Sequence, residues 1–128
     1  MRIGHIAFVS SSEEKANRFF KEALGLKELR SASIPSSLSK SIFGIDREFK
    51  VIDFGNEDMK FEVFIADHST EVPLRKLDHV CLEVKDREVL VRKCKEMGFE
   101  ILRVPKGDSL VIFLKDEDRN LFEIKERK

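Results

Sequence analysis

The sequence has no excess of either charge, no glutamine, only two cysteines and no long apolar run. Lysine plus arginine equals aspartate plus glutamate at 24 each, so no long-range field favours nucleic acid or an anionic membrane as a partner. No apolar run approaches the roughly 20 residues of a membrane helix, and the N-terminus does not resemble a secretion signal. We therefore expect a soluble, cytoplasmic protein that binds neither nucleic acid nor membrane.

Cysteine and amide side chains are scarce, and this composition predicts both the state of the cysteines and the source of the protein. Cys81 and Cys94 fall on segments with apolar faces, where a thiol more often serves as a small core residue than as a disulfide partner. Asparagine occurs only three times, whereas 38% of the residues are charged. This bias is typical of heat-adapted proteins and indicates a thermophilic source.

An internal repeat is the main feature that the sequence does contain. His5 opens an apolar segment that leads into a helical pattern ending at Gly25, 20 residues later. His79 opens a similar segment, and its helical pattern ends at Gly98, 19 residues later. Self-similarity of this kind predicts two copies of one structural unit.

Each copy has the pattern of a β-α-β-β-β unit. In the first unit, residues 1–67, a helix follows a capping box formed by Ser11 and Glu14, and strands are expected near 2–9, 26–31, 49–55 and 59–66. Strand 2–9 has apolar residues on both faces, so we expect both to be largely buried. In the second unit, residues 76–128, a helix opens at Asp86 among strands near 77–85, 99–104, 109–115 and 120–126.

The length of 128 residues is that of one domain, and no linker of domain-separating length divides the units. We therefore expect residues 1–128 to form a single α+β domain of two βαβββ units, with curved mixed sheets that form a metal-binding cleft. The first unit carries 13 extra residues, which fall most naturally in 31–47. This stretch is rich in serine around Pro35, so we expect it to be irregular, either as a lid over the site or as a surface insertion.

Four residues at matched positions of the two units form a candidate metal site: His5 and Glu62, and His79 and Glu123. Strand alternation places the glutamates opposite the apolar residues that pack under the helices. Two imidazoles and two carboxylates suit Ni, Co, Zn, Mn or Fe(II), with one divalent ion per site. Alternatively, the glutamates face solvent and the histidines are satisfied core residues; we favour metal because all four positions match.

The chain resembles the vicinal oxygen chelate superfamily, the group of glyoxalase I, bleomycin-resistance proteins and dioxygenases, whose members are built from paired βαβββ units. The resemblance spans nearly the whole chain and lies in four runs: Gly4–Val9, Leu24–Leu26, Leu77–Val80 and Asp116–Glu123. The last run is similar to the family's Asp-Pro-Asp-Gly-Asn-x-x-Glu, with Glu117 in place of Pro and Arg119 in place of Gly. Because arginine disfavours the left-handed conformation, we expect this turn to be built differently.

The resemblance implies that all four metal-ligand positions are filled. A set of four is similar to glyoxalase I or methylmalonyl-CoA epimerase, in which the metal holds substrate oxygens and stabilises an enediolate or enolate. A carboxylate then moves a proton, and Glu62 and Glu123 are the catalytic candidates. The short separation of Glu62 from His79, 17 residues, favours a glyoxalase I-like lyase or isomerase over an epimerase.

Three further residues are candidates for binding a small-molecule substrate, such as a thiol conjugate or a thioester. Arg30 could meet a substrate carboxylate, and Asp46 or Glu48 could be the second acid that the epimerases place before the third strand. Each also fits an ordinary exposed charge. A non-catalytic ligand-binding protein of the bleomycin-resistance type and a protein with a purely structural metal are the other interpretations. We also expect a homodimer, with each site formed within one chain or between two.

Overall fold

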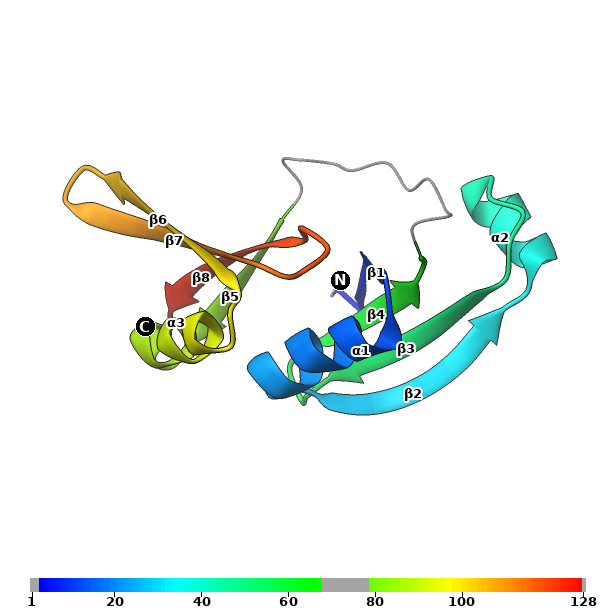
Figure 1. Cartoon of the computed structure of the whole chain (residues 1–128), viewed down its shortest axis with the longest axis horizontal. Coiled ribbons are helices and arrows are strands. Elements are labelled where there is room, and N and C mark those ends of the chain that lie inside the picture. Colours follow the sequence, from blue (N-terminus) through cyan, green and yellow to red (C-terminus); the bar gives the residue numbers. More distant parts are fainter. Residues whose placement is uncertain (1–2, 68–78, 128) are drawn as a thin grey trace. The chain divides into compact units, whose positions relative to one another are not determined.

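The computed structural model describes residues 3–67 and 79–127 of the chain, and these two ranges fall into two separate compact units (Figure 1). Each unit contains one four-stranded mixed sheet, with strand order β1-β4-β3-β2 in the first and β5-β8-β7-β6 in the second. In both sheets the first and last strands of the unit pair in parallel, and the other pairs are antiparallel. The expected α+β fold of two repeated βαβββ units is confirmed.

The first unit has one helix more than the repeat requires. Its elements are β1 (Ile6–Ser10), α1 (Glu13–Ala16), η1 (Asn17–Ala23), β2 (Lys27–Ile34), α2 (Ser36–Phe43), β3 (Phe49–Gly55) and β4 (Lys60–Ile65). α1 and η1 form one continuous helix, which is seen beside the sheet in Figure 1. α2 joins β2 to β3.

The first helix begins one residue later than the sequence predicts. Ser12 is the N-cap, and its side chain accepts a hydrogen bond of 3.1 Å from the Lys15 amide, so the prediction of a cap at Ser11 is wrong. From Asn17 the helix widens into π-type turns, and the amide of Leu24 donates to the carbonyl of Phe19. Gly25 ends the helix with φ +73°, as expected.

Aromatic rings form the core of the first unit between this helix and its sheet. The Phe20 ring is fully buried and stacks on Phe54, with 5.5 Å between the ring centroids. Phe61, from β4, lies 5.7 Å from Phe20 and meets Phe8 edge to face at 5.5 Å. The apolar face of β4 therefore packs under the helix as predicted, which leaves Glu62 on the opposite face of the sheet.

The first strand and the extra segment of this unit differ from expectation. β1 lies at the edge of its sheet, and one face of the predicted strand 2–9 is exposed: Ala7 within β1, and Ile3 (77%) and His5 in the segment before it. The prediction that both faces are buried is therefore wrong. The stretch 31–47 is also more regular than predicted. β2 extends to Ile34, because an exposed edge strand tolerates serine, and α2 then ends at Gly44 with φ +73°.

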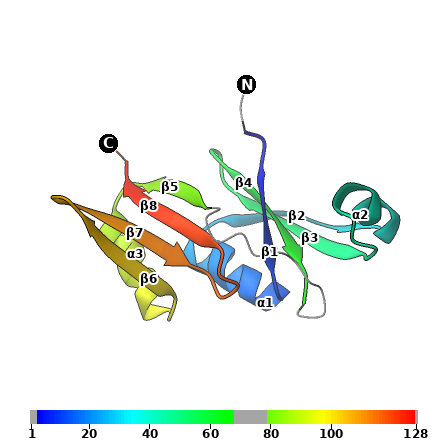
Figure 2. The same cartoon turned by 90° about the horizontal axis from the view of Figure 1, so that it is seen from above.

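The second unit repeats the pattern without the extra helix. Its elements are β5 (Val80–Val84), α3 (Arg87–Glu96), β6 (Glu100–Lys106), β7 (Ser109–Lys115) and β8 (Leu121–Glu126). Figure 2 shows the four strands of this sheet in the order β5-β8-β7-β6. The first residues of the predicted strand 77–85 lie outside the described part of the chain.

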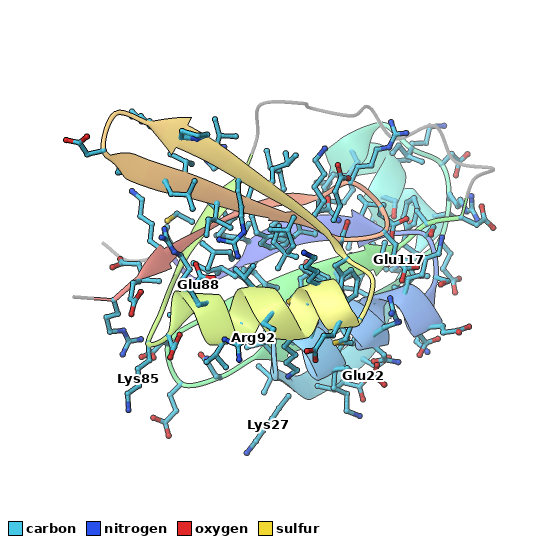
Figure 3. All side chains as sticks on the ribbon, turned by 60° about the vertical axis from the view of Figure 1, so that its left-hand side comes forward. Glu22, Lys27, Lys85, Glu88, Arg92 and Glu117 are labelled. Carbon is cyan, nitrogen blue, oxygen red and sulfur yellow. The ribbon has the colours of Figure 1, made fainter. Side chains whose placement is uncertain are left out.

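Helix α3 is placed by its cap, its apolar face and one ion pair. The Asp86 side chain caps it by accepting from the Val89 amide at 3.1 Å, as predicted. Cys94, on the inner face of this helix, is fully buried, but Cys81 on β5 is exposed. The prediction that both cysteines are core residues therefore holds for Cys94 only. Glu88, labelled in Figure 3, receives two hydrogen bonds from Arg103 of β6, at 2.9 and 3.2 Å. These bonds lower the pKa of the Glu88 carboxyl.

The turn before β8 keeps a left-handed residue despite the substitution of glycine. Arg119 has φ +68°, so the expectation of a differently built turn is wrong. The buried Asp116 side chain explains how the turn persists. Its Oδ1 accepts from the Asp118 and Asn120 amides at 2.9 and 2.8 Å, and its Oδ2 accepts from Asn120 Nδ2 at 2.7 Å. Three hydrogen bonds to one carboxyl offset a strained residue that costs about 1–2 kcal/mol.

No helix in the described ranges 3–67 and 79–127 is both long enough and apolar enough to cross a membrane.

Candidate metal centre

Strand register places one histidine and one glutamate at equivalent positions in each unit. In the parallel pair β1–β4, Glu62 lies opposite Ala7, and His5 precedes Ala7 by two residues. In the parallel pair β5–β8, Glu123 lies opposite Cys81, and His79 precedes Cys81 by two residues. Each histidine lies one residue before its strand, and its imidazole approaches the carboxylate of its glutamate on the same side of the sheet. The repeat seen in the sequence is therefore also a repeat of side-chain placement.

The distances within the two pairs agree with those of metal ligands. His5 Nε2 lies 3.4 Å from Glu62 Oε2, and His79 Nε2 lies 3.9 Å from Glu123 Oε2. Two atoms that each bind an ion at about 2.1 Å, with 90–110° between the bonds, are about 3.0–3.4 Å apart. The first pair meets this condition as it stands, and the second meets it after a side-chain shift of about 0.5 Å.

Exposure is also matched between the two pairs. The glutamate side chains are 19% and 17% exposed, and the histidine side chains are 47% and 41% exposed. A carboxylate that is mostly buried needs a cation or hydrogen-bond donors, whereas an accessible neutral imidazole can bind a metal ion that arrives from solvent. Within the described residues, no group of three or more His, Cys, Asp or Glu side chains could hold a metal ion. The predicted ligands thus occur as two pairs.

The surroundings of the pair in the first unit include an acid that sequence reasoning missed. Asp53 of β3 lies directly opposite Glu62, so the two carboxylates share a face of the sheet. Asp53 is only 4% exposed, and its Oδ1 has no hydrogen-bond partner among the described residues. Its Oδ2 lies 3.6 Å from Nε of Arg30, which is Asp53's neighbour on β2. In the sequence, Asp53 could have been noticed as a lone acid within the otherwise apolar run Val51–Phe54.

The pair in the second unit has apolar and basic neighbours instead. Phe113 of β7 lies opposite Glu123, where the first unit has Asp53, and its ring lies 5.6 Å from the His79 ring, edge to face. Lys125 Nζ lies 3.7 Å from Glu123 Oε1. Although Cys81 is exposed as a residue, partial desolvation of its sulfur raises the pKa of the thiol, and the Glu123 carboxylate raises it further, so the thiol beside this pair is neutral.

The predicted substrate-binding residues occupy two different places. Arg30 lies on the same face as the His5–Glu62 pair, next to Asp53, and its side chain is 69% exposed. Asp46 and Glu48 are exposed in the segment between α2 and β3. Glu48 precedes Asp53 by five residues, about 17 Å along an extended strand. The structure therefore places Arg30 beside the His5–Glu62 pair. Asp46 and Glu48 lie before the first residue of β3, away from that pair.

Comparison with known proteins identifies the family of this fold. A family model described as the Glyoxalase/Bleomycin resistance protein/Dioxygenase superfamily matches residues 4–113, so the chain belongs to this superfamily. No curated protein matches the chain.

Solved structures share the fold over nearly the whole chain. The trypanothione-dependent glyoxalase I of Leishmania major is 18% identical, with a TM-score of 0.75 over 98% of this chain and 86% of that chain. A glyoxalase family protein of Enterococcus faecalis is 21% identical, with a TM-score of 0.70 over 96% and 95% of the two chains. The fosfomycin resistance protein FosX of Listeria monocytogenes is 18% identical, with a TM-score of 0.70 over 100% and 94%. At these identities the likeness shows the fold alone.

Proposed function

We propose that this protein is a metal-dependent lyase or isomerase of the glyoxalase I type, and that His5, Glu62, His79 and Glu123 bind its metal. The observation that carries the proposal is the repetition of one histidine–glutamate pair at the same register in both units. A chance placement of surface charges has no reason to repeat in position, separation and exposure. A shared task for the four residues accounts for all three.

The donor atoms of the two pairs fit a divalent ion. Imidazole nitrogens and carboxylate oxygens together suit Ni, Co, Zn, Mn or Fe(II). In the first unit, Glu62 and Asp53 lie opposite each other on adjacent strands, and like charges in that arrangement repel. Arg30 offsets one of the two charges. A bound cation would offset the other.

The bound metal would supply Lewis-acid stabilisation of a substrate enediolate. In this proposal Glu62 or Glu123 accepts a proton from the carbon next to the oxygens, since each carboxylate is mostly buried yet adjacent to an accessible histidine. Arg30 presents its exposed guanidinium to an anionic part of the substrate, such as a carboxylate of a thiol conjugate or the charged tail of a thioester. We further propose that the protein acts as a homodimer.

Metal analysis of three variants tests the proposal. The wild-type protein and the variants Glu62→Ala, Glu123→Ala and Glu57→Ala are reconstituted with divalent metals and analysed for bound metal. Glu57 is an exposed acid in the turn between β3 and β4, so its variant controls for the loss of one charge. We expect about one metal per site in the wild type and in the control, and loss of metal in the other two variants.

The same samples are then assayed for hemithioacetal isomerisation and for acyl-CoA epimerisation. Metal-dependent isomerisation that both glutamate variants lose supports the proposal, whereas epimerisation alone would favour the epimerase alternative. Absence of metal from the wild type would contradict the enzyme proposal and favour a ligand-binding protein.

Mixing two inactive variants shows whether a site draws its ligands from one chain or from two. If sites are shared between chains, a dimer of Glu62→Ala with Glu123→Ala contains one site with both glutamates intact. Random pairing makes about half of the dimers mixed, so metal binding returns to about a quarter of all sites. If each site lies within one chain, every site lacks a glutamate and binding does not return. Metal content of the refolded mixture, compared with that of each variant refolded alone, distinguishes the two arrangements.

A further inference from the structure

Both units carry the dipeptide Leu-Arg at the same distance after the glycine that ends the helix of the unit. The two segments are Gly25–Arg30 and Gly98–Arg103, and in each the arginine comes five residues after the glycine. The repeat therefore predicts the same place in the fold for Arg30 and Arg103. The structure instead places the two arginines on opposite faces of their sheets.

In the second unit the arginine lies on the helix side of the sheet. β6 and β7 pair without a register shift, which places Arg103 opposite the fully buried Ile112. The Arg103 guanidinium donates two hydrogen bonds to Glu88 of α3. Leu102, one residue earlier, lies opposite Phe113 on the other face. A regular strand at this point of the repeat thus directs the arginine toward the helix.

In the first unit a β-bulge turns the arginine to the other face. The register between β2 and β3 shifts between Glu28 and Arg30, so Leu29 is an extra residue. Without this shift, Leu29 would lie opposite Asp53, and Arg30 would lie on the helix side. With the shift, Arg30 lies opposite Asp53, on the face that carries Glu62. Bulges often redirect a side chain in this way next to an active site.

Asp53 holds the redirected arginine at one end of its guanidinium. The Oδ2 atom of Asp53 lies 3.6 Å from Nε of Arg30. Asp53 is buried within β3, whereas the Arg30 side chain is 69% exposed. Because Nε is the guanidinium nitrogen nearest the backbone, this contact leaves the two outer nitrogens accessible to another acceptor. Among the described residues, no carboxylate meets those two nitrogens.

The second unit shows that the fold does not require this arrangement. It has Leu102 and Phe113 at the positions opposite each other where the first unit has Arg30 and Asp53, and it has no bulge there. Both sheets nevertheless have the same strand order around the same histidine–glutamate pair. The bulge, the arginine and the aspartate occur together in one unit and are replaced together in the other, which indicates a shared task.

We propose that the bulge at Leu29 and the carboxylate of Asp53 are positioning features, which turn Arg30 to the face of the His5–Glu62 pair and hold its outer nitrogens toward an anionic group of the substrate. Asp53 itself does not touch the substrate. The inference rests on the proposed function and adds where the anion lies. Arg30 and Glu62 are two strand spacings apart, about 10 Å between backbones, so the anion is a few bonds from the metal-binding oxygens.

Two substrates that differ by one charge provide the test. The hemithioacetal of methylglyoxal with 3-mercaptopropionate carries a carboxylate, and the one with 3-mercaptopropanamide is neutral. The measured quantity is the ratio of their kcat/KM values in metal-loaded protein, in which contributions of the shared atoms cancel. We expect the wild type to prefer the acidic substrate. Arg30→Met should lower this preference about tenfold, the loss of one hydrogen bond between charged groups.

Two possible roles of Asp53 predict opposite results for Asp53→Asn. If Asp53 positions Arg30, the guanidinium moves more freely in the variant, and the preference falls about threefold. If Asp53 only neutralises Arg30, removal of the negative charge leaves the arginine a stronger anion receptor, and the preference rises. In an Arg30→Met background, Asp53→Asn should no longer lower the preference, because no arginine remains to be positioned.

Matched controls and a second measurement separate positioning from a general effect on the fold. Asp58→Asn, an exposed acid in the turn of the same hairpin, and Arg103→Met, the counterpart of Arg30 in the repeat, should keep the wild-type preference. The ¹⁵N relaxation of the Arg30 Nε–H group, measured without metal or substrate, reports its motion. We expect Asp53→Asn to increase the motion of Arg30 and to leave that of Arg103 unchanged.

Each outcome decides the inference. A lower preference in Asp53→Asn together with a more mobile Arg30 supports it, and Asp53→Ser should give the same result if the first variant folds poorly. A raised or unchanged preference overturns the inference but leaves the proposed function standing. A lower preference without a change in the motion of Arg30 also overturns it, because Asp53 would then act in another way. Absence of isomerisation in the metal-loaded wild type refutes the proposed function, and the inference falls with it.

Discussion

The pH dependence of stability should reveal the buried carboxyl group of Asp116. Burial raises its pKa to about 6, and the hydrogen bonds from Asn120 and Asp118 oppose this rise because they favour the charged form. In the unfolded chain the carboxyl has its ordinary pKa of 3.8. The folded protein therefore binds this proton more tightly than the unfolded chain does.

The sign and size of the effect follow from that difference. Because the pKa is higher in the folded state, the contribution of Asp116 is fully present below pH 3.8 and is lost as the pH rises through about 6. A difference of about two pKa units, at about 1.4 kcal/mol per unit, corresponds to about 3 kcal/mol of unfolding free energy. The slope is greatest between the two pKa values.

Urea unfolding between pH 4 and pH 8 measures this contribution as the difference between the wild type and Asp116→Asn. The asparagine is always neutral and keeps the side-chain shape, while the Asn120 amide can turn to offer its oxygen to the new NH2 group. Subtracting the variant removes the titration of the other carboxyl groups. We expect the wild type to lose stability relative to the variant as the pH rises. A difference that stays constant or changes in the opposite direction would refute the reasoning.

Three further results are expected. Phe20→Ala should lower the unfolding free energy by about 3–5 kcal/mol in urea, because its ring is fully buried, whereas Phe43→Ala, half-exposed, should cost about 1 kcal/mol; equal losses would contradict the assigned core. Arg119→Gly should raise the free energy of unfolding by about 0.5 kcal/mol, and with it the melting temperature, since glycine adopts φ +68° without strain; a lower melting temperature would contradict this. Iodoacetamide followed by mass spectrometry should modify Cys81 well before Cys94, and simultaneous modification would contradict the burial of Cys94.

The repeat could be predicted because it depends on local patterns that recur. Strand alternation and helical spacing mark the same elements in both units, and glycine and aspartate mark helix ends through backbone geometry and capping. Gly25 and Asp86 do in the structure what these rules require. Strand boundaries agree within a few residues for the same reason, and β7 begins and ends where the sequence predicts.

The differences from prediction arise where tertiary context decides. The serines of 31–47 read as a loop, but the backbone of β2 pairs with β3 whatever its exposed side chains are. Local pattern cannot show that β1 lies at a sheet edge, nor that Cys81 is exposed, since both depend on strand order. The turn at Arg119 is a local exception: the hydrogen bonds that offset its strain join Asp116 to residues two and four positions later, but the residue types alone do not show that one carboxyl accepts all three.

The sequence predicts only those residues of the candidate site that occur at matching positions in both units. His5 and Glu62 attract notice because the second unit has counterparts for both. Asp53 has no counterpart, and its importance depends on its register with Glu62, which the sequence does not specify. The roles of Asp46 and Glu48 stay predictions, and so does the metal set of four.

The equal register of the two pairs has an evolutionary consequence. A gene that encoded a single βαβββ unit would already encode a histidine close to a glutamate, because the histidine immediately precedes the strand that pairs with the strand of the glutamate. One tandem duplication would then double this histidine–glutamate pair without any new contact having to evolve. The position opposite each glutamate could then diverge, and it is aspartate in one unit and phenylalanine in the other. Selection could therefore change that position while the histidine–glutamate pair stays constant.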